Sequence, residues 1–281
     1  GYPTPKFFQI DINSLSNLEY IINELGFPLI VKNTDSSGSR GTKIFYKNNL
    51  KDIKNTVFEA INVSKSKIAL IEECWEGPEQ TVETIFDYNG VFHPCFITDR
   101  IFDRSSGYAI ETGLRSPSSL DSKIQKEMFD LAKNIAIDLG IKIGAAKYDM
   151  ILTNNGPRVI EMTVRLSGGF DCQYLVPAAS GKNILKAAIY TSLGQLFSKN
   201  LLVDSKKKVA LSESIWPKPG IINNIHGIDN IKKFKGFEFI FFRYKVGDTI
   251  TEYVDCTKRV CFIIASGKSY DEARQNINKI K

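Results

Sequence analysis

The residues best suited to chemistry lie in the stretch 147–169, which is typical of two strands joined by a turn. In a strand, side chains two positions apart share a face, so Glu161, Thr163 and Arg165 are expected to point the same way. Asp149 lies on the partner strand of the expected hairpin, close enough to join them. The apolar residues of the second strand alternate with this polar set and can face a core: Ile160, Met162 and Val164.

Two carboxylates and a guanidinium on one face of a sheet suit Mg²⁺ together with a phosphate group. The reason is that Mg²⁺ prefers oxygen ligands and a guanidinium pairs with phosphate. The same pattern also fits an exposed hairpin face with a surface ion pair, which contributes little to stability. The hairpin residues alone leave both interpretations open.

A second candidate is the polar loop 33–41, N-T-D-S-S-G-S-R-G, between two expected strands. Glycine lets a backbone approach closely, so such a loop can bind phosphate through N–H groups and hydroxyls. The Walker pattern G-x-x-x-x-G-K-[ST] is absent, and a flexible hairpin tip is the alternative interpretation. Lys32, at the end of the preceding strand and under the loop, favours phosphate binding.

The segment 72–79, E-E-C-W-E-G-P-E, is dense in carboxylates and contains a flat aromatic ring. Trp75 is either a core residue, the commoner role for tryptophan, or one wall of a base pocket. In the second interpretation Glu79 accepts hydrogen bonds from ribose hydroxyls.

Periodicity, capping residues and glycines predict the elements that position these residues. Helices are expected over 15–25, 50–63, 123–139, 177–196 and 270–280. Strands are expected over 27–32, 42–46, 68–71, 80–87, 91–98, 148–152, 158–165, 209–215, 237–244 and 260–266. The segment 100–120 is rich in Ser, Gly and Pro, so we expect an irregular functional loop there.

Composition restricts the class of protein. The 281 residues carry a net charge of +6, with 43% hydrophobic and 24% charged residues, which suits one large or two to three small domains. The one tight basic run, 206–208, reads as a solvated linker, so no nucleic-acid partner is expected. No apolar run is long enough to span a membrane. The five cysteines are scattered and odd in number, which indicates a reduced, cytoplasmic setting. With two histidines in the sequence, a zinc site is not expected.

Four stretches occur in the order and spacing of one family: F-P-L-I-V-K, D-S-S-G-S-R-G, I-E-E-C-W-E-G-P-E, and the D…E-x-x-x-R hairpin ending in R-L-S-G-G. Over residues 1 to about 200 the chain resembles an ATP-grasp ligase of the carboxylate–amine or amino-acid ligase type, similar to carbamoyl-phosphate-synthase-like ATP-grasp proteins. The resemblance implies an α+β fold in which two α+β subdomains clamp the nucleotide. It places a lid subdomain at 1–75, a core subdomain with the metal site at 76–204, and a small C-terminal α/β domain at 205–281.

The resemblance implies a nucleotide site for ATP. Lys32 reaches the nucleotide phosphates and the loop 37–41 folds over the γ-phosphate. The segment 72–75 holds the adenine, with Glu72 facing its exocyclic amine, and Glu79 binds ribose. The implied nucleotide-binding residues are Lys32, Ser37, Gly38, Ser39, Arg40, Gly41, Glu72, Glu73, Cys74, Trp75 and Glu79.

The resemblance also implies a metal and catalytic site. Asp149 and Glu161 match the two carboxylates that bind Mg²⁺, with Mn²⁺ as an alternative metal, and Arg165 matches the arginine beside the acyl phosphate. Thr163 stands where the family usually has an asparagine, and its hydroxyl is a weaker metal ligand than an amide oxygen. Lys32 and Arg165 are therefore the expected catalytic residues.

The implied reaction joins a small-molecule carboxylate to an amine. ATP phosphorylates the carboxylate, and the amine then attacks the acyl phosphate to give an amide, ADP and phosphate. Glu111 and Arg115 are candidates for holding an amino acid's amine and carboxylate, and surface charge is the alternative. The expected substrate residues are Glu111, Arg115, Ser167, Gly168 and Gly169.

Two rival functions stay open. One is a biotin-carboxylase-like or carbamoyl-phosphate-like enzyme that uses bicarbonate, and the other is a non-catalytic nucleotide-binding fragment or split subunit. Family members normally begin with a Rossmann-like N-terminal domain, whereas this chain starts at G-Y-P-T-P. We therefore expect a truncated form or a natural split subunit, with a separate N-terminal domain or a second copy as partner. Such a chain is expected to bind nucleotide and turn over slowly.

Overall fold

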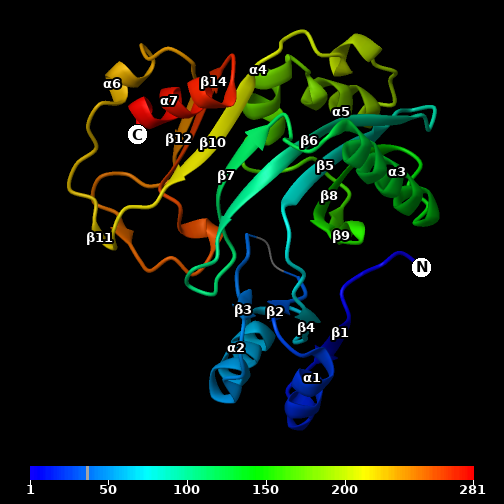
Figure 1. Ribbon diagram of the computed structural model, residues 1–281. Coiled ribbons are helices and arrows are strands. Elements are labelled where there is room, and N and C mark those ends of the chain that lie inside the picture. Colours follow the sequence, from blue (N-terminus) through cyan, green and yellow to red (C-terminus); the bar gives the residue numbers. More distant parts are fainter. Residues whose placement is uncertain (36–37) are drawn as a thin grey trace.

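The structure, a computed structural model, describes residues 1–35 and 38–281 (Figure 1). Ser37, expected in the phosphate loop, lies outside the described residues. A four-stranded and an eight-stranded sheet organise the chain, with a two-stranded ribbon in addition. Among the described residues, no helix combines the length and apolarity needed to cross a bilayer.

The N-terminal lobe, drawn in blue in Figure 1, is an antiparallel sheet in the order β1-β4-β2-β3. Two helices pack on it through their apolar faces, because residues such as Ile21 of α1 and Val57 of α2 are buried against the strands. The Asn49 side chain begins α2 by accepting from the Asp52 N–H. The elements are β1 (Phe7–Ile10), α1 (Leu18–Leu25), β2 (Leu29–Asn33), β3 (Lys43–Phe45), α2 (Leu50–Val63) and β4 (Ala69–Glu73).

The larger lobe is built on a sheet in the order β12-β14-β10-β7-β6-β5-β8-β9. Its strands are β5 (Glu79–Phe86), β6 (Phe92–Asp103), β7 (Ile110–Ser116), β8 (Gly144–Thr153), β9 (Gly156–Thr163), β10 (Val209–Ile215), β12 (Phe237–Phe242) and β14 (Cys261–Gly267). Its helices are α3 (Ser122–Asp138), α4 (Val176–Ser180), α5 (Ile184–Ser192), α6 (Ile228–Ile231) and α7 (Tyr270–Ile280). The ribbon pairs β11 (Gly220–Ile221) with β13 (Thr249–Ile250).

Helices cover this sheet and form its cores. Met128 and Ala132 of α3 pack against Tyr148 and Met150 of β8. Farther along the sheet, α7 packs on β14 and β10 through a separate cluster that includes Ile277. The first core fixes β8, which is one strand of the hairpin. The second core fixes β14, which belongs to the C-terminal segment.

Most expected elements are present, with two differences. The helix expected over 177–196 is divided into α4 and α5, because Gly181 adopts a left-handed conformation (φ 77°) and ends α4. The expectation of an irregular segment over 100–120 is wrong, since β6 continues to Asp103 and β7 begins at Ile110. The reason is long-range pairing: β7 lies between β6 and β10, which satisfies its backbone groups despite its Ser and Gly content.

The C-terminal segment shares the large sheet. β10 pairs with both β7 and β14, so strands on either side of residue 205 belong to one hydrogen-bonded sheet. The division of the chain into domains at 1–75, 76–204 and 205–281 stays a prediction.

Candidate active site

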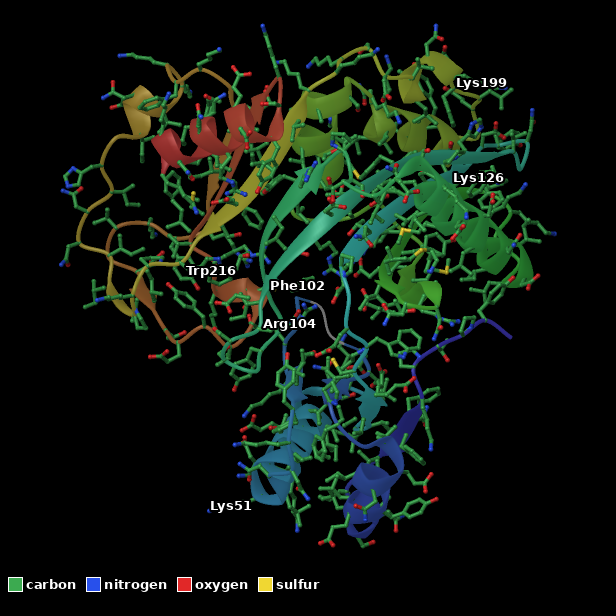
Figure 2. All side chains as sticks on the ribbon, in the orientation of Figure 1. Lys51, Phe102, Arg104, Lys126, Lys199 and Trp216 are labelled. Carbon is green, nitrogen blue, oxygen red and sulfur yellow. The ribbon has the colours of Figure 1, made fainter. Side chains whose placement is uncertain are left out.

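A cavity of about 900 Å³ is lined by residues of both lobes. Its walls come from β2, from the loop after it, from the segment following β4, from strands β5 to β9, and from the C-terminal segment around residue 256. Figure 2 shows Phe102 and Arg104 where the end of β6 approaches the small lobe. The size is in the range of small-molecule sites.

The segment after β4 connects the lobes and has a fixed backbone. The Glu73 carboxylate accepts from the Lys6 N–H at 2.9 Å and from Trp75 Nε1 at 3.0 Å, and the Cys74 N–H donates to Pro28 O at 2.9 Å. Trp75 is half-buried and lines the cavity, which supports its interpretation as a wall of a pocket. Burial raises the pKa of the Cys74 thiol to about 11, so this thiol is neutral and a poor nucleophile at pH 7.

Lys32 and Glu72 form an ion pair at the edge of the cavity. The distance from Lys32 Nζ to Glu72 Oε2 is 2.6 Å, and both side chains are largely buried. Lys32 therefore extends from the end of β2 into the cavity, as the sequence predicted for a residue that reaches phosphates. The carboxylate of Glu72, expected to face an adenine amine, is engaged with Lys32.

The loop after β2 folds over one side of the cavity. Gly38, Ser39 and Arg40 line the cavity, whereas Gly41 does not. Gly38, Ser39 and Gly41 all have positive φ values, between 59° and 71°, which gives the loop its tight curvature. The Gly38 carbonyl accepts from the Cys256 N–H at 3.0 Å, so this loop contacts the C-terminal segment.

The hairpin of β8 and β9 places Asp149 directly opposite Glu161. A β-bulge follows, because Met150 pairs with Val159 and leaves Ile160 as the extra residue. The expected strict alternation of faces is therefore wrong, and Met162, which packs on the core beside α3, lines the cavity as well. Ile160 lines the cavity together with Glu161, and the third apolar residue, Val164, is 72% exposed and not in the core.

Asp149 is buried among cations. Its Oδ2 lies 2.5 Å from Lys147 Nζ and 3.0 Å from Arg100 Nη1. Burial alone would raise the pKa of Asp149, but Arg100 and Lys147 hold it below its usual value. Glu161, by contrast, has a 58% exposed side chain and lies 3.9 Å from Lys147 Nζ.

The hairpin residues fit a magnesium ion that also binds phosphate. Thr163 Oγ1 is buried and has no hydrogen-bond partner among the described residues, and it lies on the strand that carries Glu161. The described residues contain no group of three or more acidic, histidine or cysteine side chains arranged to hold a metal ion by themselves. Mg²⁺ typically uses one or two carboxylates and takes its other ligands from water and substrate phosphates, so two carboxylates and a hydroxyl suffice.

A buried arginine that we did not predict joins three acidic residues. Arg100 Nε lies 2.9 Å from Glu111, and its Nη1 lies 3.3 Å from Glu79 and 3.0 Å from Asp149. Burial raises the pKa of Glu79, although Arg100 and Arg104 oppose that shift. The one sequence signal for Arg100 was its position just beyond the expected strand 91–98, where the strand in fact continues.

Glu111 faces the cavity, but Arg115 does not. A β-bulge between β6 and β7 pairs Glu111 with Phe102 and Gly113 with Ile101, so the residue between them, at position 112, is extra. The bulge reverses the faces that follow, and the Arg115 guanidinium instead lies 4.9 Å from the ring centre of Tyr270, outside the cavity lining. The expectation that Arg115 shares a site with Glu111 is thus corrected.

The segment after β9 contributes backbone and one charge. Arg165 and the three residues Ser167, Gly168 and Gly169 line the cavity. The Ser167 N–H donates to Glu83, and the Ser167 hydroxyl donates to Asp171 at 3.3 Å. Burial raises the pKa of Glu83 to about 8 and that of Asp171 to about 7.

Further cavity residues were missed, and several of them come from the C-terminal segment. Lys147 belongs to β8, and the C-terminal segment supplies Arg243, Cys256 and Arg259. No local motif marks the three C-terminal positions in the sequence, since each depends on how the strands of that segment join the large sheet.

Comparison with known proteins identifies the larger part of the chain. The family described as ATP-grasp domain matches residues 25–173, and the L-amino acid ligase C-terminal domain 2 matches residues 215–280. A D-alanine–D-alanine ligase of Pseudomonas fluorescens is 30% identical over 184 residues, which cover 64% of this chain and 53% of that protein. Carnosine synthase 1 of Homo sapiens is 22% identical over 206 residues, which cover 69% of this chain and 24% of that protein.

A solved structure supports the fold. The L-amino acid ligase from Bacillus licheniformis superposes with a TM-score of 0.79 at 21% identity, over 100% of this chain and 66% of that one. The chain spans about half the length of the D-alanine–D-alanine ligases that it matches. The expected α+β ATP-grasp fold is confirmed. Because the ATP-grasp domain accounts for more than half of its residues, the chain belongs to the ATP-grasp family.

Proposed function

We propose that the chain provides the active site of an ATP-dependent carboxylate–amine ligase, which forms an amide or peptide bond through an acyl phosphate. The observation that carries this proposal is the single cavity in which the nucleotide residues, the two hairpin carboxylates and Arg165 face the same space. The match of residues 215–280 to a domain of L-amino acid ligases supports amino acids as the substrate class.

The nucleotide end of the cavity is the connection between the lobes. The segment 72–75 lines this end of the cavity and would hold the adenine, with Trp75 as an aromatic wall. Lys32 would exchange its pairing with Glu72 for the phosphates of ATP, because a multiply charged phosphate is the stronger partner for an ammonium group. Glu79, which pairs with Arg100 and Arg104, would accept a hydrogen bond from the ribose.

The phosphate end of the cavity is the hairpin. Asp149, Glu161 and Thr163 would hold Mg²⁺ or Mn²⁺, which when bound neutralises charge on the transferring phosphoryl group. Lys147 holds the Asp149 carboxylate in place through the 2.5 Å contact. Arg165 adds a second positive charge for the phosphoryl group on the open side of the cavity.

The reaction at this end transfers a phosphoryl group and then an acyl group. One oxygen of the substrate carboxylate attacks the γ-phosphorus, and ADP leaves. The amine of the second substrate then attacks the carbonyl carbon and loses a proton, and phosphate leaves with the carboxylate oxygen. Glu111 is placed to hold a substrate ammonium group, and the backbone around Gly168 lines the cavity beside Arg165.

Release of ADP with pairs of L-amino acids tests this function. We expect ADP release that requires both amino acids and a divalent metal. ADP release that needs bicarbonate instead would replace the proposal with a biotin-carboxylase-like reaction. Binding of MgADP without release for any pair would make the chain a nucleotide-binding unit.

A further inference from the structure

The C-terminal segment contributes a buried guanidinium to the cavity. Arg259 is 7% exposed, and it lines the cavity beside Glu111, whose Oε1 lies 3.8 Å from Arg259 Nη1. Its Nε donates to the Cys256 carbonyl at 2.8 Å. The group thus has one good hydrogen bond, through Nε, and one long ion pair, through Nη1, and no carboxylate of the described residues pairs with it through two donors.

Aromatic rings fix the plane of this guanidinium. Its central carbon lies 4.6 Å from the ring centre of Phe262 and 5.9 Å from that of Trp216. Together with the Nε hydrogen bond, these contacts set the orientation of Arg259 before any ligand arrives. A pre-oriented arginine loses little side-chain freedom on binding, so its pairing with a carboxylate is favoured.

Other buried cations of the cavity are already engaged with acidic residues. Lys32 pairs with Glu72 at 2.6 Å, and Lys147 pairs with Asp149 at 2.5 Å. Arg100 contacts three carboxylates at 2.9 to 3.3 Å, and the partly buried Arg104 pairs with Glu79. Arg165 and Arg243 also line the cavity but are exposed to solvent. Arg259 therefore differs from the other buried cations of the cavity, because its acidic partner lies 3.8 Å away.

A chain of ion pairs orders these groups. Asp149 contacts Arg100, Arg100 contacts Glu111, and Glu111 is followed by Arg259. Arg259 is thus separated from the hairpin carboxylate by two intervening side chains. The substrate carboxylate that is phosphorylated must lie beside the hairpin and Arg165. A second substrate carboxylate is therefore the natural partner of Arg259, which lies at the other end of this series of ion pairs.

We propose that Arg259 binds the substrate carboxylate that is not consumed, namely the free carboxylate of the amino acid whose amine attacks. The inference rests on the proposed ligase function and names a specificity-determining residue for it. The C-terminal segment then does more than complete the sheet, because it selects acceptors that carry a free carboxylate next to the reacting amine.

Equilibrium binding tests this role without relying on turnover. The probes are L-alanyl-L-alanine and L-alanyl-L-phenylalanine, each compared with its C-terminal amide, in titration calorimetry with the full chain and saturating MgADP. These peptides carry the unconsumed carboxylate and lack the consumed one. Wild type is expected to prefer at least one acid over its amide by on the order of ten- to hundred-fold, the usual effect of a charge-assisted pair.

The variants separate recognition from folding. Arg259→Met is expected to bind acid and amide equally, and Arg259→Lys to recover part of the preference. Arg274→Met is a matched control, because Arg274 also pairs with a carboxylate and lies 5.5 Å from the ring centre of Tyr270, yet it does not line the cavity. An unchanged thermal shift with MgADP shows that each variant is folded.

Two results would overturn the inference. One is a wild type that shows no preference for either free acid, and the other is an acid preference that survives in Arg259→Met or disappears equally in Arg274→Met. If the wild type does not bind MgADP, the proposed function itself is contradicted. The two failures are therefore distinguishable.

Discussion

Replacement of Arg100 by methionine removes the cation shared by three acidic residues while keeping a side chain of similar length. Glu79, Glu111 and Asp149 are all within 3.3 Å of its guanidinium, and the Arg100 side chain is 15% exposed. Removing one partner from a buried ion pair typically destabilises a protein by about 3–5 kcal/mol, because it leaves an uncompensated buried charge.

The structure places the expected loss at the lower end of that range. Glu79 keeps Arg104 and Asp149 keeps Lys147, whereas Glu111 keeps only the 3.8 Å contact with Arg259. One carboxylate of three is therefore left poorly paired, and we expect about 3 kcal/mol. A chain of this size loses roughly 2–4 °C in Tm per kcal/mol, so the melting temperature should fall by roughly 10 °C.

Thermal unfolding followed by tryptophan fluorescence measures this loss. Lys126→Met is the matched control, because Lys126 pairs with Asp130 on the exposed face of α3 (Figure 2), where such pairs contribute little to stability. Adding Glu111→Gln to Arg100→Met should recover part of the loss, since it removes the poorly paired charge. If Arg100→Met melts within about 2 °C of wild type, the reasoning on buried charge is refuted.

Three further predictions concern the nucleotide, the metal and pH. Lys32→Ala should weaken MgADP binding by roughly ten- to hundred-fold in calorimetry, and an unchanged affinity would remove Lys32 from the phosphate site. Glu161→Ala should abolish the Mg²⁺ dependence of ADP binding, and full Mg²⁺-dependent affinity would contradict the hairpin metal site. Burial raises the pKa of Glu83 to about 8 and that of Asp171 to about 7, so in this range the folded protein holds more protons than the unfolded chain. The contribution of these groups to stability should therefore be complete below their unfolded pKa values, at about pH 4 and lower, and be lost as pH rises to about 8. Glu83→Gln should flatten that fall, and equal slopes of Tm against pH in the variant and the wild type would contradict the assignment.

Local signals were sufficient for much of the fold. The helix over 50–63 has its asparagine cap and apolar face in adjacent sequence, and it is observed with the predicted bounds. The hairpin around Asp149 and Glu161 was predicted from alternation and turn residues, and the structure pairs the two residues directly. In both cases neighbours in sequence determine the element and its pairing, although the bulge at Ile160 breaks the predicted alternation of faces in the hairpin.

Positions set by long-range pairing were not predictable in the same way. One extra residue in β7 reverses the faces beyond it, which turns Arg115 away from the cavity that Glu111 faces. Arg100 and Arg259 are brought to Glu111 by β6 and by the C-terminal segment, from 11 residues and more than one hundred residues away. A bulge or a sheet partner leaves no strong local signal, because it depends on the twist and neighbours of the whole sheet.

The transfer of oxygen from carboxylate to phosphate tests the central claim most directly. An amino acid labelled with ¹⁸O in its carboxylate is mixed with ATP, Mg²⁺, a second amino acid and an excess of enzyme, so that a single slow turnover suffices, and the released phosphate is analysed by mass spectrometry. The acyl-phosphate account predicts one ¹⁸O atom in each phosphate and no requirement for bicarbonate. Unlabelled phosphate, or release that depends on bicarbonate, would contradict it.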